Sequence, residues 1–325
     1  MNIDRSDVRR ILVITLSNLG DVILTTPVVA TLRREFPGSR IDILVGPAGK
    51  EVFEKDWNIF KVIVYDKHMS IAGKRRLQLK LKKLKYDLVV DLRNTVFGIL
   101  IGPKYRTSTL QQFPEDIVHR MDRHLYRLKS LGIENTLRRP YVHISPEDEL
   151  YAANLLKDRD VRDSFVVINP GSKSHLKRWT AEGFAAVADR LITECGIDII
   201  FTGVKEDAEV VADVAAKMKH GAHNLTGKTS VRQLGELIKR SKLLITNDSA
   251  PLHLGCAVGA RVLAIFGPTD PKKYGPTGEF DMVVNKKLFC SPCETAMCKY
   301  NYECMKLISA EDVFDAAKMM IEGYE

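Results

Sequence analysis

An aspartate follows a glycine in the segment SNLGD at residues 17–21, directly after a strand-like apolar run. Gly20 lets the backbone come close to a ligand. Asp21 would lie at a strand end where a helix begins, and the positive potential of a helix N-terminus would keep its carboxylate ionised, as a general base requires. The plainer alternative is that Asp21 only caps the helix. The segment therefore predicts either a general base or a helix cap.

Two later segments combine residues that suit a diphosphate. The first is NPGS at 169–172 followed by KRW at 177–179, in which Lys177 would be a point charge for phosphate oxygens. The second is NDSAPLH at 247–253, a strand end followed by cap residues and a proline, where the first N–H groups of a helix can bind an anion. A solvated loop and an ordinary helix cap are the respective alternatives. His253 taken alone is more typical of a satisfied interior histidine, and FGPTDP at 266–271 is typical of a rigid turn.

The C-terminal part of the chain holds four of the six cysteines within a short stretch, in the pattern C-x2-C-x4-C-x5-C. Such a group could hold zinc or an iron–sulfur cluster. The spacing matches neither the paired C-x2-C of a zinc ribbon nor a ferredoxin run. A metal site, a local disulfide and unpaired buried thiols therefore all stay open for these residues: Cys290, Cys293, Cys298 and Cys304.

Several familiar enzyme motifs are absent from the sequence. No G-x-G-x-x-G follows the first strand-like run, which disfavours a nicotinamide or flavin enzyme. The GKT at 227–229 lacks the earlier glycine of a Walker A loop, because position 222 is alanine. No G-x-S-x-G elbow and no H-E-x-x-H zinc helix are present.

Length and composition predict a globular protein of two domains. The chain has 325 residues, is 45% hydrophobic and 28% charged, and has a mean hydropathy of −0.12. No apolar run approaches the roughly 18 residues of a membrane-spanning helix, and runs such as 11–16 and 96–101 have strand length. The charged start indicates no secretory signal, and the cysteine content favours a cytoplasmic location.

The net charge of +8 lies entirely in the first half of the chain. Residues 1–150 carry 26 Lys and Arg against 18 Asp and Glu, whereas residues 151–325 carry 23 of each. The excess is densest between Lys67 and Lys85, where no acidic residue occurs. Such a block attracts nucleic acid, anionic lipid head groups or acidic sugars, although it is also typical of a solvated helix face. Nucleic acid is disfavoured because aromatic stacking residues are missing from the basic run.

Two series of alternating strands and helices must position these residues. The first half predicts strands at 11–16, 41–45, 62–65 and 87–92, a helix up to about residue 36, and a helix at 120–131. The second half predicts strands at 165–169, 198–202, 243–246 and 261–266 and helices at 181–195, 208–218, 231–239, 250–258 and 309–322. This order predicts two doubly wound parallel sheets, in domains 1–150 and 151–325, with ligands at the carboxyl ends of the strands.

Taken together, the motifs resemble glycosyltransferase family nine, the lipopolysaccharide heptosyltransferases. The resemblance rests on residues 11–45 (ILVITLSNLGDVILTTPVVATLRREFPGSRIDILV), on VVINPGS with KRWTAEGFAAVADRL, on FTGVKEDAE, and on residues 243–271 (LLITNDSAPLHLGCAVGARVLAIFGPTDP). It implies a GT-B fold of two Rossmann-like domains facing across a cleft, with the acceptor site in the first, the nucleotide-sugar site in the second, and a C-terminal helix that crosses back to the first.

The resemblance also implies roles for individual residues. The family's catalytic aspartate falls on Asp21 and its phosphate-binding lysine on Lys177. The aspartate that meets the donor sugar falls on Asp248, and the acid that contacts the ribose on Glu206, with Asp207 and Glu209 as alternatives. The full set of donor-site candidates is Ser172, Lys177, Thr202, Gly203, Glu206, Asp248, Ser249, Ala250 and His253. The acceptor-site candidates are Asn18, Gly20, Lys67, Lys74, Arg75 and Arg76.

The activity that the resemblance implies is inverting transfer of heptose from ADP-heptose to a lipopolysaccharide core acceptor of the Kdo and lipid A type. No cofactor is expected for the chemistry, and zinc or another metal at the cysteines would be structural. The basic first domain would attract this anionic acceptor and hold the enzyme at the cytoplasmic face of the inner membrane as a peripheral protein. The alternatives are a family relative that uses another nucleotide sugar for another polysaccharide, and a sugar-nucleotide-binding protein without transfer activity.

Overall fold

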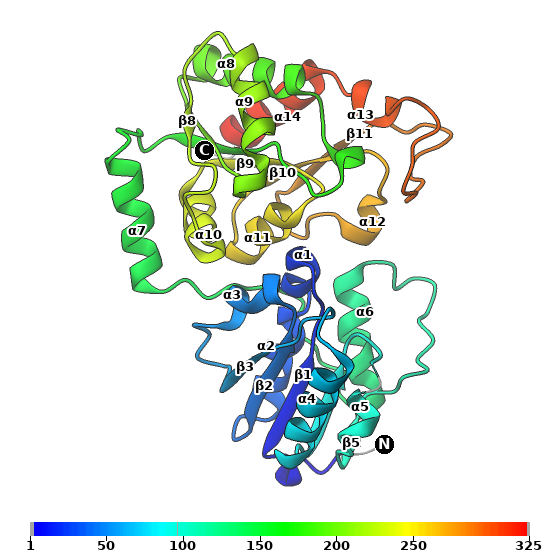
Figure 1. Ribbon diagram of the computed structural model, residues 1–325. Coiled ribbons are helices and arrows are strands. Elements are labelled where there is room, and N and C mark those ends of the chain that lie inside the picture. Colours follow the sequence, from blue (N-terminus) through cyan, green and yellow to red (C-terminus); the bar gives the residue numbers. More distant parts are fainter. Residues whose placement is uncertain (1–2, 96, 324–325) are drawn as a thin grey trace. The chain divides into compact units, whose positions relative to one another are not determined.

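The computed structural model describes residues 3–95 and 97–323, and the chain divides into two units, Met1–His143 and Ile144–Glu325 (Figure 1). The division falls a few residues before the boundary predicted from sequence. Helix α7 (Pro146–Lys157) therefore belongs entirely to the second unit. Its start is fixed by a capping box between Ser145 and Asp148.

The first unit is built on a five-stranded sheet in the order β3-β2-β1-β4-β5. All neighbouring strands pair in parallel. The strands are β1 (Arg10–Ile14), β2 (Arg40–Val45), β3 (Lys61–Val64), β4 (Leu88–Asp91) and β5 (Tyr105–Arg106). The chain proceeds from β1 to one side and later returns to place β4 on the other side. The topological switch point, where α/β sheets bind ligands, therefore lies between β1 and β4.

Short helices connect these strands. They are α1 (Leu19–Ile23), α2 (Thr26–Glu35), α3 (Lys50–Phe53), α4 (Ile71–Lys83), α5 (Phe97–Leu100) and α6 (Arg120–Tyr126), with 3-10 turns η1 (Arg5–Asp7), η2 (Pro47–Gly49) and η3 (Arg127–Leu131). The single helix predicted up to residue 36 is two helices, because Pro27 in the first turn of α2 cannot donate to a continuous helical ladder. The apolar run 96–101 was expected to have strand length, but its described part forms α5 instead.

The second unit has a six-stranded sheet in the order β11-β10-β9-β6-β7-β8, again with parallel neighbours. Its strands are β6 (Phe165–Asn169), β7 (Asp198–Phe201), β8 (His223–Asn224), β9 (Leu243–Asn247), β10 (Val262–Phe266) and β11 (Met282–Asn285). Here the switch point lies between β6 and β9. Four of these strands are buried along nearly their whole length, as expected for a sheet that is covered on both faces.

The helices of the second unit after α7 are α8 (Ala181–Cys195), α9 (Ala208–Lys217), α10 (Val231–Arg240), α11 (Ala250–Val258), α12 (Pro271–Tyr274), α13 (Glu303–Lys306) and α14 (Ala310–Glu322), with 3-10 turns η4 (His175–Lys177) and η5 (Lys205–Asp207). Caps fix their ends. The Thr180 side chain accepts from the Gly183 N–H at the start of α8, and Gly196 ends that helix in the left-handed conformation.

Helix α14 departs from the expected course. Its buried face, which includes Val313, Phe314 and Ala317, packs into the core that α8 and the second sheet form. The described chain up to residue 323 is accordingly part of the second unit. The prediction that this helix crosses back to the first domain is therefore wrong. Separately, no described helix is both long enough and apolar enough to span a membrane.

Candidate functional site

Two asparagines end the strands that flank the switch point of the second unit. Asn247, the last residue of β9, donates from Nδ2 to the Pro170 carbonyl at 2.8 Å, and its Oδ1 accepts from the Trp179 N–H at 3.0 Å. Asn169, the last residue of β6, donates to the Thr202 carbonyl at 3.0 Å. These buried bonds hold the loops that follow β6, β7 and η4 in fixed positions, because each loop is bonded to the end of a neighbouring strand.

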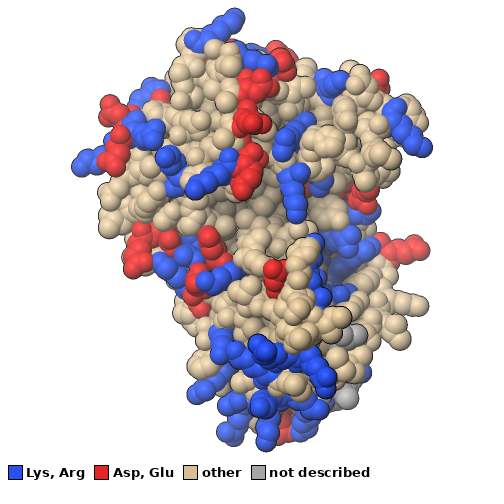
Figure 2. Space-filling view, in the orientation of Figure 1, with Lys and Arg blue, Asp and Glu red and all other residues tan. Residues whose placement is uncertain are grey.

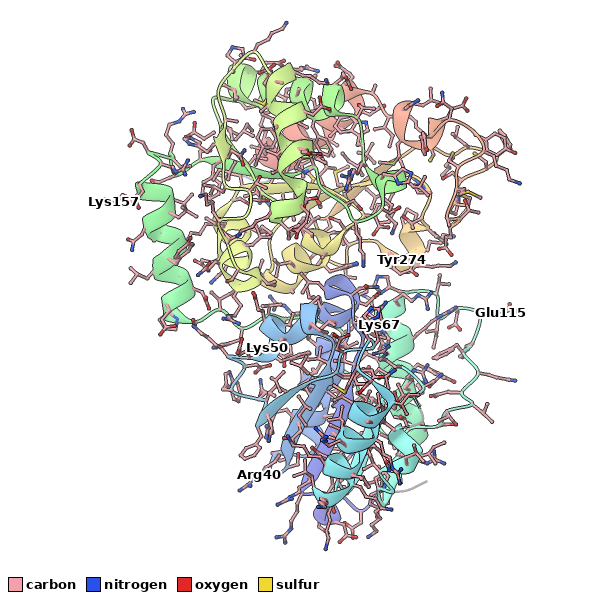
Figure 3. All side chains as sticks on the ribbon, viewed as in Figure 1. Arg40, Lys50, Lys67, Glu115, Lys157 and Tyr274 are labelled. Carbon is pink, nitrogen blue, oxygen red and sulfur yellow. The ribbon has the colours of Figure 1, made fainter. Side chains whose placement is uncertain are left out.

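Lys177 and Asp248 meet at this edge of the sheet, although they lie far apart in the sequence. Lys177 Nζ is 2.6 Å from Asp248 Oδ2, and Thr269 Oγ1 donates to the same oxygen at 2.6 Å. Asp248 is only 5% exposed, so these two donors replace its lost hydration. The ammonium of Lys177 also lies 5.8 Å from the ring centre of Tyr274 at the end of α12 (Figure 3). The ammonium is thus held at the carboxyl edge of the sheet.

The start of α11 lies beside this pair. Ser249 is the N-cap residue of α11, and its hydroxyl is 3.2 Å from Thr246 Oγ1. The Ala250 N–H at the start of α11 has no acceptor within the helix, whereas Pro251 carries no N–H and the Leu252 N–H donates to the Ser249 carbonyl at 3.2 Å. His253 is buried in the same helix and is not without an interaction partner. The structure therefore brings together the predicted residues Lys177, Asp248, Ser249 and Ala250.

The three acidic candidates for a ribose contact follow β7 and differ in their surroundings. Asp207 Oδ2 accepts from the Val204 N–H at 3.1 Å and so caps η5. A Cβ atom on Gly171 would lie only 2.4 Å from Asp207 Cγ, which explains why the loop after β6 has glycine there. Glu206 is exposed in the same turn, as is Glu209 at the start of α9. Asp207 has a structural role, and the assignment of Glu206 stays a prediction.

Three further predicted residues lie in the same loops. Thr202 is fully buried and its hydroxyl is 3.3 Å from Asn169 Nδ2, while Gly203 next to it packs against Asp207. Ser172 is buried, and its carbonyl accepts from Arg178 Nε at 2.8 Å. Thr202 and Ser172 therefore help to shape the loops around Lys177.

Trp179 links this loop to the C-terminal part of the chain. Its indole Nε1 donates to the Ile308 carbonyl at 3.0 Å, just before α14 begins. The ring packs edge-on against Phe184 with 5.0 Å between the ring centres, and Gly183 leaves the space that the indole occupies. The position of Lys177 therefore depends on a residue that comes 129 positions after Trp179.

In the first unit, Asp21 lies in the first turn of α1, at the carboxyl end of β1. Asn18 is the N-cap residue, and its Nδ2 is 3.1 Å from Asp21 Oδ2. The turn after β2 approaches closely, since a Cβ atom on Gly46 would lie 2.8 Å from Ser17 Cα. Gly20 in the same turn is partly exposed. The structure thus places Asp21 at the switch point of the first sheet, beside Asn18.

Basic residues lie in the loop that follows β3 of the first sheet and in the helix after it. Lys67 is exposed in the loop after β3 (Figure 3), and Lys74, Arg75 and Arg76 lie in the first turns of α4. On the face that Figure 2 shows, basic side chains gather over the part of the first unit that contains α4. The predicted acceptor candidates therefore come from the loop after β3 and the helix that follows it.

A second polar group, which is not predicted from the sequence, lies at the end of β4. Asp91 caps the following loop, because its carboxylate accepts from the Arg93 and Thr95 N–H groups at 2.9 and 2.7 Å. Asn94 has a positive φ of 55°, and its Oδ1 accepts from Arg127 Nη1 at 2.7 Å. The sequence signals only a strand at 87–92, which contains Asp91 near its end. The structure adds Arg93 and Arg127 as cations near the first switch point.

His124, in α6, is a buried titratable group near these cations. Burial, together with the nearby charges of Arg127, Arg120 and His119, lowers the pKa of His124 to about 3. In the described structure its Nδ1 has no hydrogen-bond partner. His124 is therefore neutral at neutral pH.

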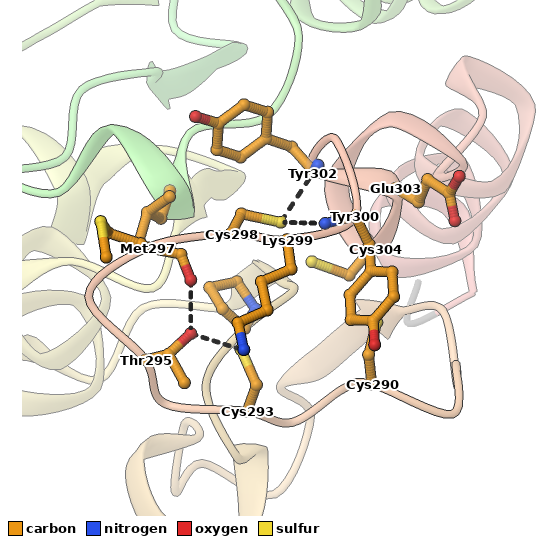
Figure 4. A pocket seen from close by; sticks show the side chains of 12 residues that line it. Cys290, Cys293, Thr295, Met297, Cys298, Lys299, Tyr300, Tyr302, Glu303 and Cys304 are labelled. Atoms are coloured by element: carbon orange, nitrogen blue, oxygen red, sulfur yellow. Dashed lines mark hydrogen bonds between the residues drawn. The ribbon is translucent and has the colours of Figure 1, made fainter.

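All six cysteines are free thiols. Within residues 3–95 and 97–323, no three His, Cys, Asp or Glu side chains are arranged as ligands around one point. The four cysteines of the C-terminal segment nevertheless line one pocket of the second unit (Figure 4).

A doubly wound sheet with a lysine and a helix start at its switch point is typical of α/β proteins that bind anionic ligands such as nucleotides. The family itself follows from a match of residues 100–303 to the model of glycosyltransferase family 9 (heptosyltransferase), and the chain belongs to this family. It is accordingly a glycosyltransferase, and the predicted fold of two parallel-sheet α/β domains is confirmed.

Known relatives cover nearly the whole chain. Lipooligosaccharide heptosyltransferase 2 of Campylobacter jejuni is 27% identical over 318 residues, which span 94% of this chain and 96% of the relative. The crystal structure of a family 9 glycosyl transferase from Veillonella parvula matches with a TM-score of 0.86 and 28% identity, covering 99% of both chains. The ADP-heptose lps heptosyltransferase II structure of E. coli matches with a TM-score of 0.80 and 21% identity, covering 96% of this chain and 98% of that one, and so supports the GT-B fold.

Proposed function

We propose that this enzyme transfers heptose from ADP-heptose to a lipopolysaccharide core acceptor of the Kdo and lipid A type. The support for heptose is that relatives of almost the same length are heptosyltransferases acting on lipooligosaccharide or lipopolysaccharide. The observation that carries the proposed mechanism is the Lys177–Asp248 pair at the switch point of the second unit, bonded at 2.6 Å.

The second unit binds the nucleotide sugar in this proposal. Lys177 and the N–H groups at the start of α11 contact the diphosphate, and Glu206 contacts the ribose. As the sugar–phosphate bond breaks, negative charge grows on the leaving diphosphate. A fixed ammonium and fixed N–H dipoles stabilise that charge without reorganising, which is the most effective form of electrostatic catalysis. The buried bonds of Asp248, Thr269 and Asn247 provide this fixation.

Asp21 acts as the general base. Its carboxylate takes the proton of the acceptor hydroxyl while that oxygen forms a bond to the anomeric carbon. The bond from the anomeric carbon to the phosphate oxygen breaks, its electron pair leaves with the nucleoside diphosphate, and the configuration inverts. No cofactor takes part in these steps. Asn18 orients the base, because its amide nitrogen is 3.1 Å from Asp21 Oδ2.

The cations of the first unit attract the anionic acceptor. The cations concerned are Lys67, Lys74, Arg75 and Arg76. The same basic helix, α4, holds the enzyme at an anionic membrane surface, which would be the cytoplasmic face of the inner membrane. Each basic residue close to such a surface contributes about 1 kcal/mol to binding.

Release of nucleoside diphosphate tests the proposal. The enzyme is incubated with ADP-heptose and Kdo-containing lipid A, beside a panel of UDP- and GDP-sugars. ADP release that requires both ADP-heptose and the acceptor is the expected result. Turnover of another sugar nucleotide without turnover of ADP-heptose would contradict the donor, and would favour a relative that builds another surface polysaccharide.

A further inference from the structure

The segment that joins β11 to α14 carries four cysteines around one pocket, outside the residues that act in the proposed reaction. The pocket is lined by Cys290, Cys293, Cys298 and Cys304, together with Leu176 and Tyr302 among others (Figure 4). Cys304 is buried in α13, and the other three lie on irregular backbone. The fold therefore gathers four soft ligands that are spread over fifteen positions of an otherwise irregular segment.

Two of the sulfur atoms already accept hydrogen bonds or lie close to a hydroxyl. Cys298 Sγ accepts from the backbone N–H groups of Tyr300 and Tyr302, at 3.4 and 3.3 Å. Cys293 Sγ is 3.3 Å from Thr295 Oγ1. Donors of this kind stabilise negative charge on sulfur, and metal-bound thiolates are typically surrounded by such outer partners.

The backbone is folded back to make these bonds. Asn301 and Tyr302 both have positive φ, of 50° and 61°, a conformation that is uncommon for residues other than glycine. The two consecutive left-handed residues turn the chain around Cys298, so that its sulfur faces two N–H groups. The two N–H dipoles stabilise a negatively charged sulfur. They stabilise a neutral thiol or a disulfide sulfur much less, because neither carries a charge.

All four thiols line the same pocket of the second unit. Two further cysteines, Cys195 and Cys256, lie outside this group.

We propose that Cys290, Cys293, Cys298 and Cys304 together bind one thiophilic metal ion, zinc or iron, in a structural four-thiolate site. Four cysteine ligands are the donor set that tetrahedral zinc and iron prefer. The sulfurs do not yet surround one point, so the side chains turn inward when the ion binds. Each thiol that ligates the ion releases its proton to solvent.

The place of the site suggests what the ion stabilises. The Cys293 and Glu294 N–H groups donate to the Pro268 carbonyl at 3.0 and 2.9 Å, next to Thr269. The Tyr302 ring contacts the His175 ring in η4, with 6.0 Å between the ring centres, and Lys177 ends that same turn. The cysteine segment therefore supports both loops that meet at Asp248. This positioning role is independent of which sugar nucleotide the enzyme uses.

Metal analysis of the full-length protein, purified without oxygen, tests the proposal. We expect about one equivalent of zinc plus iron per chain. Cys293→Ser and Cys298→Ser should lose most of it, whereas the matched controls Cys195→Ser and Cys256→Ser should keep it. Cobalt reconstitution should give thiolate-to-metal charge-transfer bands and the intense bands of tetrahedral cobalt, in the wild-type protein and in both controls.

A second measurement covers the case in which the cysteine variants fail to fold. Titration of the wild-type protein with an organomercurial reagent should release the metal as the four clustered thiols react. Less than about a tenth of an equivalent, after reconstitution of the reduced protein with zinc or iron(II), would overturn the proposal. Equal metal loss in the two control variants, or disulfides among the four cysteines in the anaerobic protein, would also overturn it. None of these readouts depends on sugar transfer.

Discussion

At the carboxyl edge of the second sheet, Asp248 is buried and bonded to Lys177 and Thr269, whereas at the corresponding edge of the first sheet Asp21 is partly exposed, although Asp91 is buried and bonded there. Asp248 is 5% exposed and has two donors on one oxygen, while Asn18, beside Asp21, is exposed. Residues 151–325 are also electrically neutral, and residues 1–150 carry the whole net charge of +8.

The difference matches the two kinds of ligand in the proposed reaction. A small nucleotide sugar is best bound by a rigid site, whose groups lose no further freedom on binding. A large anionic acceptor is attracted over a long range by excess positive charge, which acts before any fixed contact forms. The same sheet plan thus supports a prebuilt site in one unit and an open, electrostatic one in the other. Four predictions test this comparison.

The largest expected effect comes from removing the proposed general base, Asp21, from the first unit. Asp21→Asn should lower kcat by about 10²–10⁴-fold, because general-base assistance contributes that factor. Affinity for ADP should not change, since the nucleotide is assigned to the other unit. Steady-state kinetics and calorimetry would measure both quantities. Asp116→Asn, at an exposed aspartate of the first unit, is the control. Near-normal turnover by a folded Asp21→Asn enzyme would remove Asp21 from the mechanism.

The basic helix of the first unit should give the next largest effect. Changing Lys74, Arg75 and Arg76 together to Gln should weaken binding to anionic vesicles by roughly 3 kcal/mol, or about a hundredfold. Vesicle co-sedimentation at low and physiological salt would measure the change. The control triple variant, Lys157, Arg159 and Lys242 to Gln, removes the same charge from exposed positions of the second unit. Equal losses in the two triple variants would show that net charge, and not α4, determines binding.

In the prebuilt site, Lys177→Met should raise the Kd for ADP. A hydrogen bond to a charged group contributes about 1.5–3 kcal/mol, or roughly 10- to 150-fold in Kd. Lys173→Met, at an exposed lysine of the same loop, should leave the Kd unchanged. Because Lys177→Met also leaves the buried Asp248 carboxylate unpaired, the double variant with Asp248→Asn should regain thermal stability without regaining affinity. Full ADP affinity in Lys177→Met would argue against a phosphate contact.

The smallest expected effect is on acid stability, and it should appear in the first unit. The folded pKa of His124 is lowered to about 3 by burial and by nearby cations, against about 6.5 in the unfolded chain. The unfolded chain therefore takes up the proton first as the pH falls, so the contribution of neutral His124 is complete above about pH 6.5 and is lost toward pH 3.

Urea unfolding at pH 7 and pH 5 would measure this loss. Between these values the wild-type protein should lose up to about 2 kcal/mol more than His124→Gln does, at 1.36 kcal/mol per pKa unit. His68→Gln, at an exposed histidine of the same unit, should behave like the wild type. Hydrogen exchange should show the earliest opening in α6. Identical pH dependence in wild type and His124→Gln would mean that His124 is not the buried neutral group described.

The regular elements could be predicted from sequence where a periodic apolar run ended in a cap. The bounds predicted for α8 and α11 are those observed, because Thr180 and Gly196 delimit one helix and Pro251 and Gly259 the other. The short strands β8 and β11 were missed, since a few residues cannot show a period of two. The run 96–101 was expected to have strand length for the same reason, because short apolar runs look alike in strands and in buried helices.

The site could be predicted residue by residue, but its bonds could not. Lys177, Asp248 and Thr269 each lay in a recognisable motif, yet the sequence does not show that they meet at one carboxylate oxygen. That meeting depends on the order of β6, β9 and β10 in the sheet, which is a tertiary property. Arg127 was missed because it reaches the end of β4 from a distant 3-10 turn.

The bond from the Trp179 indole to the Ile308 carbonyl also bears on how the protein is made. A ribosome that has just completed the Lys177 loop must still add 129 residues after Trp179 before the partner of that indole exists. At about 5–20 residues per second, this interval is roughly 6 to 26 s. The Lys177 loop is therefore synthesised early, but its contact with the residue before α14 can form only late.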